Sequence, residues 1–587
     1  SNEFNAKQRT TLIAVGVGIV VVCLCVIVAA WGGKSVWDNL QERSGITTDQ
    51  SGWDSATAEV TIAVSPGMAS TLAQLAEQFN AHTYKTPDDS LMLVRTVSVV
   101  PEKMVEQSLA NPPFQAIAPD SSLWLNQLDR LWVEKQSETE GEALIPIGNR
   151  RFGDPVRYAA SPVVIAAWES VARELGWPDR DIGWKDIQQK ATATAATADA
   201  TFKWNHPSTG HASGLLATLA EFYAGAGLTR GLTEETATAE TTLEYVRAVE
   251  ATVRFYGEGE DVIVQRLAAE GRNFLDAFVA QEQVVIAWNQ MQPGERLVAI
   301  YPAEGTLWAD HPLALLELGM PGEAPITDNQ RRTYQAFVNY LTSAEVQKQL
   351  LSVGYRPADL DIRLDGTGSP FTGDAVDWRQ PQTTLQIPAT SVVEVVQNVW
   401  WYTKRPTNVY LVVDTSGSME ERDKISLTRV ALRSFVDQIR GDRDQVGLIT
   451  FATNVNLIRS LQPLDDAGRT QLDSAIDGLI ASGNTALIDG VWMAYTELMQ
   501  HGDPESINAI VVMTDGQENS SRQSLSALQR RIQQEQGTQQ IVIFTIAFGS
   551  DADEKLMRTM AEMGGGQYRR ADETDIEDLY EIISTYF

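Results

Sequence analysis

Five side chains in the last third of the sequence have types and spacing suited to holding a divalent cation. Asp414, Ser416 and Ser418 follow an apolar run as Asp-x-Ser-x-Ser, which places one carboxylate and two hydroxyls on a tight turn. Thr485 stands at the head of a predicted helix, and Asp515 ends a second apolar run. Mg²⁺ prefers six oxygen ligands and keeps several waters. The alternative interpretation is a set of Asx/Ser turns without metal.

The elements that must position these residues form an α/β pattern over residues 408–587. The segments NVYLVVD, QVGLITFAT, INAIVVMT and QIVIFTIAFG are predicted strands, and KISLTRVALRSFVDQI and TDIEDLYEIISTYF are predicted helices. In this order the polar residues fall on three loops at strand ends. The spacing of apolar and polar segments therefore predicts one domain with its polar site on one edge of a sheet.

Residues 408–587 resemble a von Willebrand factor A (VWA) domain, which has a Rossmann-like fold. The resemblance implies a metal-ion-dependent adhesion site in which Ser416, Ser418 and Thr485 bind the metal through their hydroxyls. It also implies that Asp414 and Asp515 act mostly through bridging water and hydrogen bonds. Mg²⁺ is the expected cofactor, with Mn²⁺ and Ca²⁺ as alternatives. A protein partner is expected to complete the metal shell with a carboxylate.

Catalytic motifs are missing from the sequence. Ser416 lacks a GxSxG elbow, and a phosphate-binding GxxxxGK[ST] loop is absent. The five histidines fall in no recognisable triad context, and they are His82, His206, His211, His311 and His501. A metal pair formed by His206 and His211 is an alternative to a plain loop at these two residues. The protein is therefore expected not to be an enzyme.

Residues 57–357 show repeated strand-loop-helix units, which predict a parallel sheet with helices on its faces. Among the predicted helices are the segment EGRNFLDAFVAQE and one long amphipathic helix over residues 329–351. The order of elements, from AVSPGMASTLAQLAEQFNA to LTSAEVQKQLLSVGYRP, resembles an extracellular solute-binding protein with the periplasmic-binding-protein-like type II fold. The segments APDSSLWLNQLD, SPVVIAAWE and YPAEGTLWADHP fit internal landmarks of that family. The resemblance implies a two-lobed domain that closes on a small solute.

Candidate solute contacts lie where predicted strands end. Helix N-termini offer free N–H groups and a positive dipole end, which suit an anion. Serine at such a position is also the usual N-cap, which is the alternative role. Asn289 and Tyr301 follow runs predicted as strands, VVIAWNQ and LVAIY, and would line the cleft. The candidate ligand-binding residues are Ser65, Ser121, Ser122, Ser213, Asn289 and Tyr301.

The N-terminal region has the pattern of a single-pass membrane anchor. Residues 11–31 carry no charge and are long enough to span a bilayer as a helix. Lys7 and Arg9 precede this run, so residues 1–10 are expected in the cytoplasm. A cleaved signal peptide is the alternative. Residues 32–56 are predicted to be a stalk, which places the bulk of the chain outside the cell membrane.

Composition narrows the functional classes further. The 587 residues carry a formal net charge of −31, which argues against nucleic-acid binding. The two cysteines, Cys23 and Cys25, both fall in the apolar N-terminal run, so no disulfide framework is expected.

The sequence therefore predicts a membrane-anchored extracytoplasmic binding protein. Residues 358–407 are predicted as a linker or packed extension between the solute-binding-like region and the VWA region. In this interpretation the VWA region binds a protein partner through its metal, and the other region takes a small solute or anion. The alternative is the substrate-binding component of a transport system with an accessory VWA domain.

Overall fold

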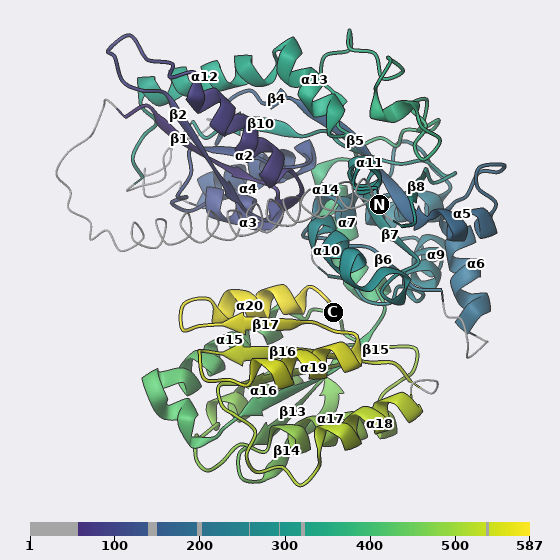
Figure 1. Cartoon of the computed structure of the whole chain (residues 1–587), viewed down its shortest axis with the longest axis vertical. Helices are drawn as coiled ribbons and strands as arrows, with labels where there is room; N and C mark the ends of the chain where they lie inside the picture. Colours follow the sequence, from purple (N-terminus) through teal and green to yellow (C-terminus); the bar gives the residue numbers. More distant parts are fainter. Residues whose placement is uncertain are drawn as a thin grey trace, which may run out of the picture. The chain divides into compact units, whose positions relative to one another are not determined.

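The computed structural model describes residues 57–138, 150–195, 202–257, 259–292, 294–317, 323–535 and 539–587 (Figure 1). All of them lie within one of the two units into which the chain divides, Ala56–Phe587. The predicted cytoplasmic segment, anchor and stalk, residues 1–56, lie outside the described residues. Within the described ranges, no helix combines the length and the apolar character that crossing a membrane requires.

The first part of the chain builds a five-stranded sheet in the order β2-β1-β3-β10-β4. Its strands are β1 (Glu59–Val64), β2 (Leu93–Ser98), β3 (Ala116–Ala118), β4 (Val156–Arg157) and β10 (Pro312–Leu315). Strands β1, β2 and β3 pair in parallel, as predicted, whereas β10 runs antiparallel to β3 and to β4. The helices of this lobe are α2 (Pro66–Ala81), α3 (Pro101–Ser108), α4 (Ser122–Glu138), α12 (Asp328–Leu341) and α13 (Ala344–Ser352).

A second sheet has the order β11-β5-β7-β6, with β8 and β9 also paired to β5. Its strands are β5 (Ala159–Trp168), β6 (Trp204–Asn205), β7 (Ala277–Gln281), β8 (Leu297–Ile300), β9 (Trp308–Ala309) and β11 (Arg356–Pro357). Only β6 and β7 pair in parallel. The helices of this lobe are α5 (Glu169–Leu175), α6 (Trp184–Ala195), α7 (Ala212–Ala226), α8 (Glu234–Ala237), α9 (Glu240–Glu250), α10 (Glu260–Glu270) and α11 (Glu282–Gln290).

Three element predictions were wrong in this region. The run FLDAFVAQE, predicted as a helix, contains strand β7, and VVIAWNQ, predicted as a strand, lies in helix α11. Short apolar runs do not by themselves separate a buried strand from a buried helix. The predicted single helix over residues 329–351 is two helices. Ser343 lies between them and is the N-cap of α13, where its side chain accepts a hydrogen bond from the Val346 N–H (3.4 Å).

The segment between the two regions is packed rather than loose. Arg356 donates to both oxygens of Glu282 (2.7 and 2.8 Å) and to the carbonyls of Trp378 and Gln380 (3.2 and 2.8 Å). The Leu385 N–H donates to the Thr306 carbonyl (2.9 Å). Helix α14 (Thr390–Thr403) then leads into the last region. The alternative of a packed extension therefore describes residues 358–389 better than a free linker.

The last region contains a six-stranded sheet in the order β14-β13-β12-β15-β16-β17, parallel except for the edge strand β14. Its strands are β12 (Thr407–Asp414), β13 (Gln445–Phe451), β14 (Val455–Pro463), β15 (Ile507–Thr514), β16 (Ile541–Phe548) and β17 (Tyr568–Ala571). Its helices are α15 (Lys424–Gln438), α16 (Asp466–Asp477), α17 (Leu487–His501), α18 (Leu525–Glu535), α19 (Glu554–Gly564) and α20 (Ile576–Ser584).

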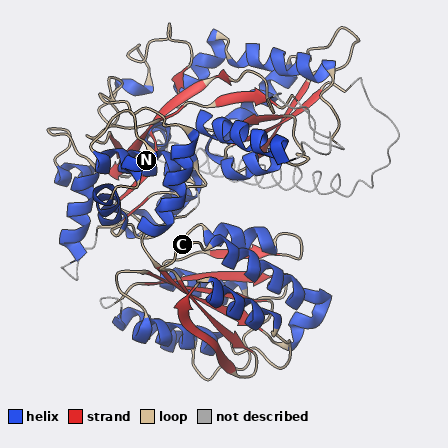
Figure 2. Cartoon of the chain, turned by 180° about the vertical axis from the view of Figure 1, so that it is seen from behind, coloured by secondary structure: helices blue, strands red, loops and turns tan. Residues whose placement is uncertain are grey.

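Helices cover both faces of this sheet, with the red strands between blue helices in Figure 2. The two-residue period of β12 explains how one strand serves both faces. Val409, Leu411 and Val413 pack in the core that holds α15 and α20, whereas Tyr410 and Val412 pack with α17 and α19. The strand is therefore apolar from Val409 to Val413, and the first residue of the site, Asp414, comes where it ends.

Candidate metal centre

Three loops meet at the carboxyl edge of the last sheet. Strand β12 ends at Asp414 and its parallel neighbour β15 ends at Thr514, directly before Asp515. Thr485 lies on the loop that leads into α17, and this loop is tied to the first one because the Gly417 N–H donates to the Gly483 carbonyl (3.0 Å). Parallel pairing thus brings together residues separated by up to about a hundred positions.

The oxygen atoms of the site lie at the spacing of metal ligands. Ser416 Oγ is 3.1 Å from Ser418 Oγ, and Ser418 Oγ donates to Asp515 Oδ1 at 2.6 Å. Adjacent ligands of an octahedral Mg²⁺, each 2.0–2.1 Å from the ion, are about 2.9 Å apart. The donor set consists of oxygen only, as a hard cation requires. The residues present therefore fit a divalent metal.

Thr485 joins this group through the close approach of Gly516. A Cβ atom at Gly516 would lie 3.2 Å from Thr485 Oγ1 and 3.6 Å from Ser418 Oγ. The backbone of Thr485 is held by Asn519, whose Oδ1 accepts a hydrogen bond from the Thr485 N–H (3.0 Å). A larger residue at Gly516 would crowd both hydroxyls.

Asp414 holds the loop that carries Ser416 through hydrogen bonds to its carboxylate. It is fully buried, and its carboxylate accepts from the Ser416 N–H (2.7 Å) and from the Thr514 hydroxyl. Burial raises the pKa of Asp414 to about 6, against the opposing effect of these hydrogen bonds. Both oxygens are therefore engaged in holding the loop, which agrees with the indirect role that the VWA resemblance implies.

Lys424 is a site residue that the sequence analysis missed. Its Nζ donates to Asp515 Oδ2 at 2.6 Å, and its side chain is only 7% exposed. Lys424 is the first residue of α15. The sequence feature that could have identified it is a lysine at the start of an amphipathic helix, shortly after the Ser418 loop. The ammonium group offsets the charge of Asp515, so the net negative charge of the site is smaller than the count of its carboxylates suggests.

A hollow of about 420 Å³ opens beside Ser418 and Asp515. Lys424 and Gly516 also line it, and its other lining residues are Glu421, Gln517, Ser550, Asp551 and Ala552. The hollow is large enough for an external side chain to reach the Ser418 hydroxyl and the Asp515 carboxylate, and Glu421 and Asp551 add two further carboxylates to its lining.

The candidate solute residues are engaged within the chain. Ser65 Oγ accepts from the Asp120 N–H (2.9 Å), and Ser121 Oγ accepts from the Leu123 N–H (3.3 Å), so Ser121 caps α4. The Ser122 N–H donates to Asp310 Oδ1 (2.7 Å). The N-terminus of α4, an expected anion seat, is therefore taken by a carboxylate of the same chain.

The other three candidates lie in the second lobe. Ser213 is fully buried in the first turn of α7. Asn289 lies on α11, where its amide pairs with the backbone N–H and carbonyl of Leu297 (3.0 and 2.8 Å). Tyr301 donates to Glu282, accepts from the Asp377 N–H (3.3 Å) and lines a separate hollow of about 600 Å³ beside the packed extension. The structure does not bring these six residues into one group.

Acidic residues that the sequence analysis did not select lie among these positions. Asp120 is buried, and burial, together with the charges of Glu260 and Asp310, raises its pKa to about 8. Burial likewise raises the pKa of Glu260. Asp310 is in turn bound by Arg157 (2.8 Å). Such surroundings oppose the binding of an anion, which was one of the two expected ligand classes.

Family models match both regions of the chain. The model of the bacterial extracellular solute-binding protein matches residues 60–356, about half of the chain. The model of the von Willebrand factor type A domain matches residues 408–582. These matches confirm the two resemblances seen in the sequence.

Individual relatives are distant. The uncharacterized protein YfbK of Escherichia coli (strain K12) is 25% identical over 233 residues, which is 38% of this chain and 38% of YfbK. The sulfate-binding protein SubI from Mycobacterium tuberculosis H37Rv is 15% identical, covering 56% of this chain and 92% of SubI, with a TM-score of 0.35. Proximal thread matrix protein 1 of the mussel byssus, solved with a zinc-occupied MIDAS motif, is 19% identical, covering 33% and 51%, with a TM-score of 0.27.

Proposed function

Because the chain belongs to the bacterial extracellular solute-binding protein family and carries a von Willebrand factor type A domain, we propose that it is an extracytoplasmic binding protein. In this proposal the VWA domain binds a protein partner through a divalent metal, and residues 11–31 anchor the chain in the cell membrane with its bulk outside. No catalytic role is proposed. The observation that carries the proposal is the group of hydroxyl and carboxylate oxygens of Ser416, Ser418 and Asp515, two of which line an open hollow.

Each residue of the site has a distinct task in this proposal. Ser416, Ser418 and Thr485 would supply neutral oxygens to the metal, while Asp414 and Asp515 fix the loops and would accept hydrogen bonds from water around it. A metal held mainly by neutral ligands stays electrophilic, so a carboxylate from a partner binds well as a further ligand. Lys424 holds Asp515 in place (2.6 Å).

The acidic rim of the hollow narrows the class of partner. Glu421 and Asp551 line the approach to the site. A partner carboxylate that stood alone would be repelled by this rim, whereas neighbouring lysines or arginines on the partner would be attracted. The proposed partner segment therefore combines an Asp or Glu with flanking basic residues.

The experiment measures metal binding first and partner binding second. Mn²⁺ binding to the full chain is followed by electron paramagnetic resonance for the unaltered protein, for Asp414→Ala with Ser416→Ala, and for Ser474→Ala. Ser474 is an exposed helical serine whose hydroxyl donates to the Thr470 carbonyl (2.8 Å), which makes it a matched control. The double variant should lose Mn²⁺ binding, and the control should keep it.

Partner binding is then tested by cross-linking on intact cells in Mg²⁺ or in chelator. The proposal requires a cross-linked protein that forms with Mg²⁺ and is lost both in chelator and in the double variant. Cross-linking that is equal in all three conditions would rule out a metal-dependent contact.

Transport of a small solute is the second candidate function, favoured by membership in the solute-binding family. The carboxylates of Asp120, Glu260 and Asp310 around the expected anion seat favour a cationic or neutral solute over an anion. A thermal-shift screen of the full chain against matched cationic, neutral and anionic solutes tests this, since a ligand of the folded state raises the unfolding midpoint. A shift with cations and none with anions is expected if this function holds.

A further inference from the structure

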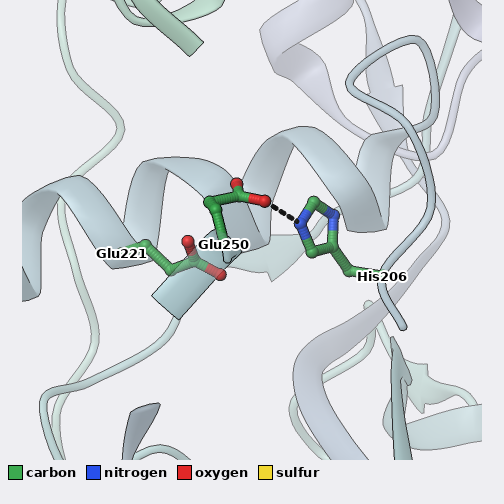
Figure 3. Close-up of side chains that lie close together, drawn as sticks. All are labelled: His206, Glu221 and Glu250. Carbon is green, nitrogen blue, oxygen red and sulfur yellow. Dashed lines mark hydrogen bonds and ion pairs between the residues drawn. The ribbon is translucent and has the colours of Figure 1, made fainter. Parts of the chain in front are cut away.

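Three buried side chains in the second lobe point toward one another, well away in the sequence from the VWA site. They are His206 after β6, Glu221 on α7 and Glu250 at the end of α9 (Figure 3). All three are fully buried, and one ligand atom from each lies within 4.8 Å of the other two. From sequence, a metal pair of His206 with His211 is the alternative to a plain loop at these residues. Among the described residues the structure instead brings His206 to two glutamates.

Hydrogen-bond chemistry fixes the tautomer of His206. Its Nδ1 is 2.8 Å from the carbonyl oxygen of Pro207, which can only accept, so Nδ1 carries a proton. In a neutral ring Nε2 then presents a lone pair, and it faces Glu250 Oε2 at 3.2 Å. Metal-binding histidines commonly donate their other ring N–H to a backbone carbonyl in this way.

Glu250 is already supplied with donors from other directions. The Trp400 indole N–H donates to Oε1 (2.6 Å), and the Tyr256 hydroxyl donates to Oε2 (2.7 Å). The carboxylate is therefore held in position, and its Oε2 faces a ring nitrogen that carries no proton when the imidazole is neutral. Two lone pairs, on His206 Nε2 and Glu250 Oε2, would then face each other, and a positive ion bound between these atoms would remove the repulsion.

Glu221 is the independent sign that a ligand belongs here. Its side chain has no exposed surface, and neither carboxylate oxygen has a hydrogen-bond partner among the described residues. A buried carboxylate without a partner is strongly disfavoured. The side chain nevertheless lies beside Glu250 rather than turning to solvent (Figure 3).

We propose that His206 Nε2 and the carboxylates of Glu221 and Glu250 bind a divalent metal ion, with zinc as the best match to this donor set. Zinc takes histidine nitrogen and carboxylate oxygen at 2.0–2.2 Å in tetrahedral sites, where neighbouring ligands are about 3.3 Å apart. The separation of 3.2 Å between Nε2 and Oε2 fits that edge. Zinc balances two carboxylates, and a water or a second carboxylate oxygen completes the shell.

The position of this site gives it a structural role. It would join α7, α9 and the loop after β6, and through the bond from Trp400 it would also hold α14, the helix that leads to the VWA domain. The loop reaches α7 only because residue 214 is glycine, since a Cβ there would lie 2.2 Å from the Pro207 carbonyl oxygen. Closed sites with every ligand buried stabilise a fold rather than catalyse.

The competing arrangement uses protons in place of the metal. Burial and the neighbouring charge of Glu250 hold the pKa of Glu221 well above its usual range, so a protonated Glu221 beside a charged His206–Glu250 pair is the metal-free alternative. The two arrangements differ in metal content, which can be measured directly.

The test counts tightly held zinc in the full chain, in a Ser416→Ala background that disables the VWA site. Protein grown with zinc and purified without a histidine tag is dialysed against a mild chelator and analysed by mass spectrometry for metals. One zinc per chain is expected, and Glu221→Gln, which keeps the side-chain shape, should lose it. Glu260→Gln is the control, because Glu260 is another buried carboxylate of the same lobe and lies outside the cluster.

The proposal is overturned if the dialysed protein holds no zinc, or if Glu221→Gln retains as much as Glu260→Gln. If Glu221→Gln does not fold, refolding of the Ser416→Ala protein from denaturant and chelator decides the question. Recovery of native circular dichroism that requires added Zn²⁺, with zinc retained in the refolded protein, supports the site. Equal recovery without metal contradicts it.

Discussion

At the scale of single residues, Lys424 shows how the VWA site balances its charge. Asp515 is buried and would be costly if it stood ionised and alone. The lysine Nζ, 2.6 Å from Asp515 Oδ2, provides a counter-charge from within the chain. A bound divalent ion and Lys424 therefore act on the same carboxylate, and each weakens the other's attraction to it.

Lys424→Met is expected to strengthen metal binding. Removing the ammonium relieves a repulsion worth roughly 1.4 kcal/mol, which corresponds to about tenfold in affinity. Titration with Mn²⁺ measures the change, and Lys555→Met, at an exposed helical position, serves as the control. Weaker binding in Lys424→Met would mean that the lysine's main effect is to hold Asp515 in place.

Asp120 predicts a pH dependence of stability. Its pKa in the folded chain is about 8, mainly through burial, whereas an unfolded aspartate has a pKa of about 3.9. Between these values the folded state binds the proton more tightly, so this group's contribution to the free energy of unfolding is full at low pH. That contribution falls as pH rises toward 8.

Asp120→Asn should remove this fall, because an amide does not ionise. Unfolding midpoints measured from about pH 5 to about pH 8 should therefore decline less in the variant than in the unaltered chain. Asp361→Asn changes an exposed carboxyl and should follow the unaltered chain. Parallel curves for all three proteins would contradict the raised pKa.

At the scale of elements, long periodic segments were predictable and short apolar runs were not. The strand before Asp414 and the helix that begins at Lys424 follow from sequence. The strand is an unbroken apolar run over residues 409–413, and the apolar residues of the helix repeat every three or four positions. The assignment of β7 as a strand and α11 as a helix was not predictable. A run of five buried residues such as β7 fits both the two-residue period of a strand and the 3.6-residue period of a helix. Which strands pair with one another could not be predicted either, and so the contact between Asp310 and the N-terminus of α4 could not be predicted.

The grouping of the five oxygen-bearing residues was predictable for the same reason. All five stand at or within a few residues of the ends of strongly patterned elements. The buried cluster of His206, Glu221 and Glu250 was not, because its members come from a loop and from two helices with no shared motif.

Arg356→Met should destabilise the first region by about 3–5 kcal/mol, the usual cost of leaving a buried charge without its partner. Glu282 has no exposed side-chain surface and receives two N–H bonds from this arginine. Arg356→Lys keeps the charge without the paired donors, so a smaller loss is expected. Arg379→Met removes an exposed ion pair with Asp377 and should change the unfolding free energy by about 0–1 kcal/mol in chemical denaturation.

At the scale of the whole molecule, a few contacts join the solute-binding-like region to the VWA domain. Arg405 donates to the Val253 carbonyl (2.8 Å) and to the carbonyls of Glu505 and Ser506 (2.8 and 3.3 Å). The ring of Phe255 lies 5.7 Å from that of Tyr586. These contacts provide a physical route by which a change in one region could reach the other.

Arg405→Ala should separate the unfolding of the two regions. The unaltered chain is expected to unfold in one calorimetric transition over Ala56–Phe587, and the variant in two, because the guanidinium no longer bridges the carbonyls. Scanning calorimetry measures this, with Arg379→Ala as the control. Two transitions already present in the unaltered chain would show that Arg405 does not couple the regions.

The hydrogen bond from the Ser122 N–H to Asp310 has a consequence for any solute. A carboxylate tethered at 2.7 Å and held from its other side by Arg157 competes with external anions at an effective concentration of about millimolar or more. Sulfate or a free carboxylate would have to displace this internal occupant before it could bind. Asp310 thus occupies the N-terminal end of α4 as an external anion would, and replacing Asp310 with asparagine is the direct way to ask whether an anion can bind there.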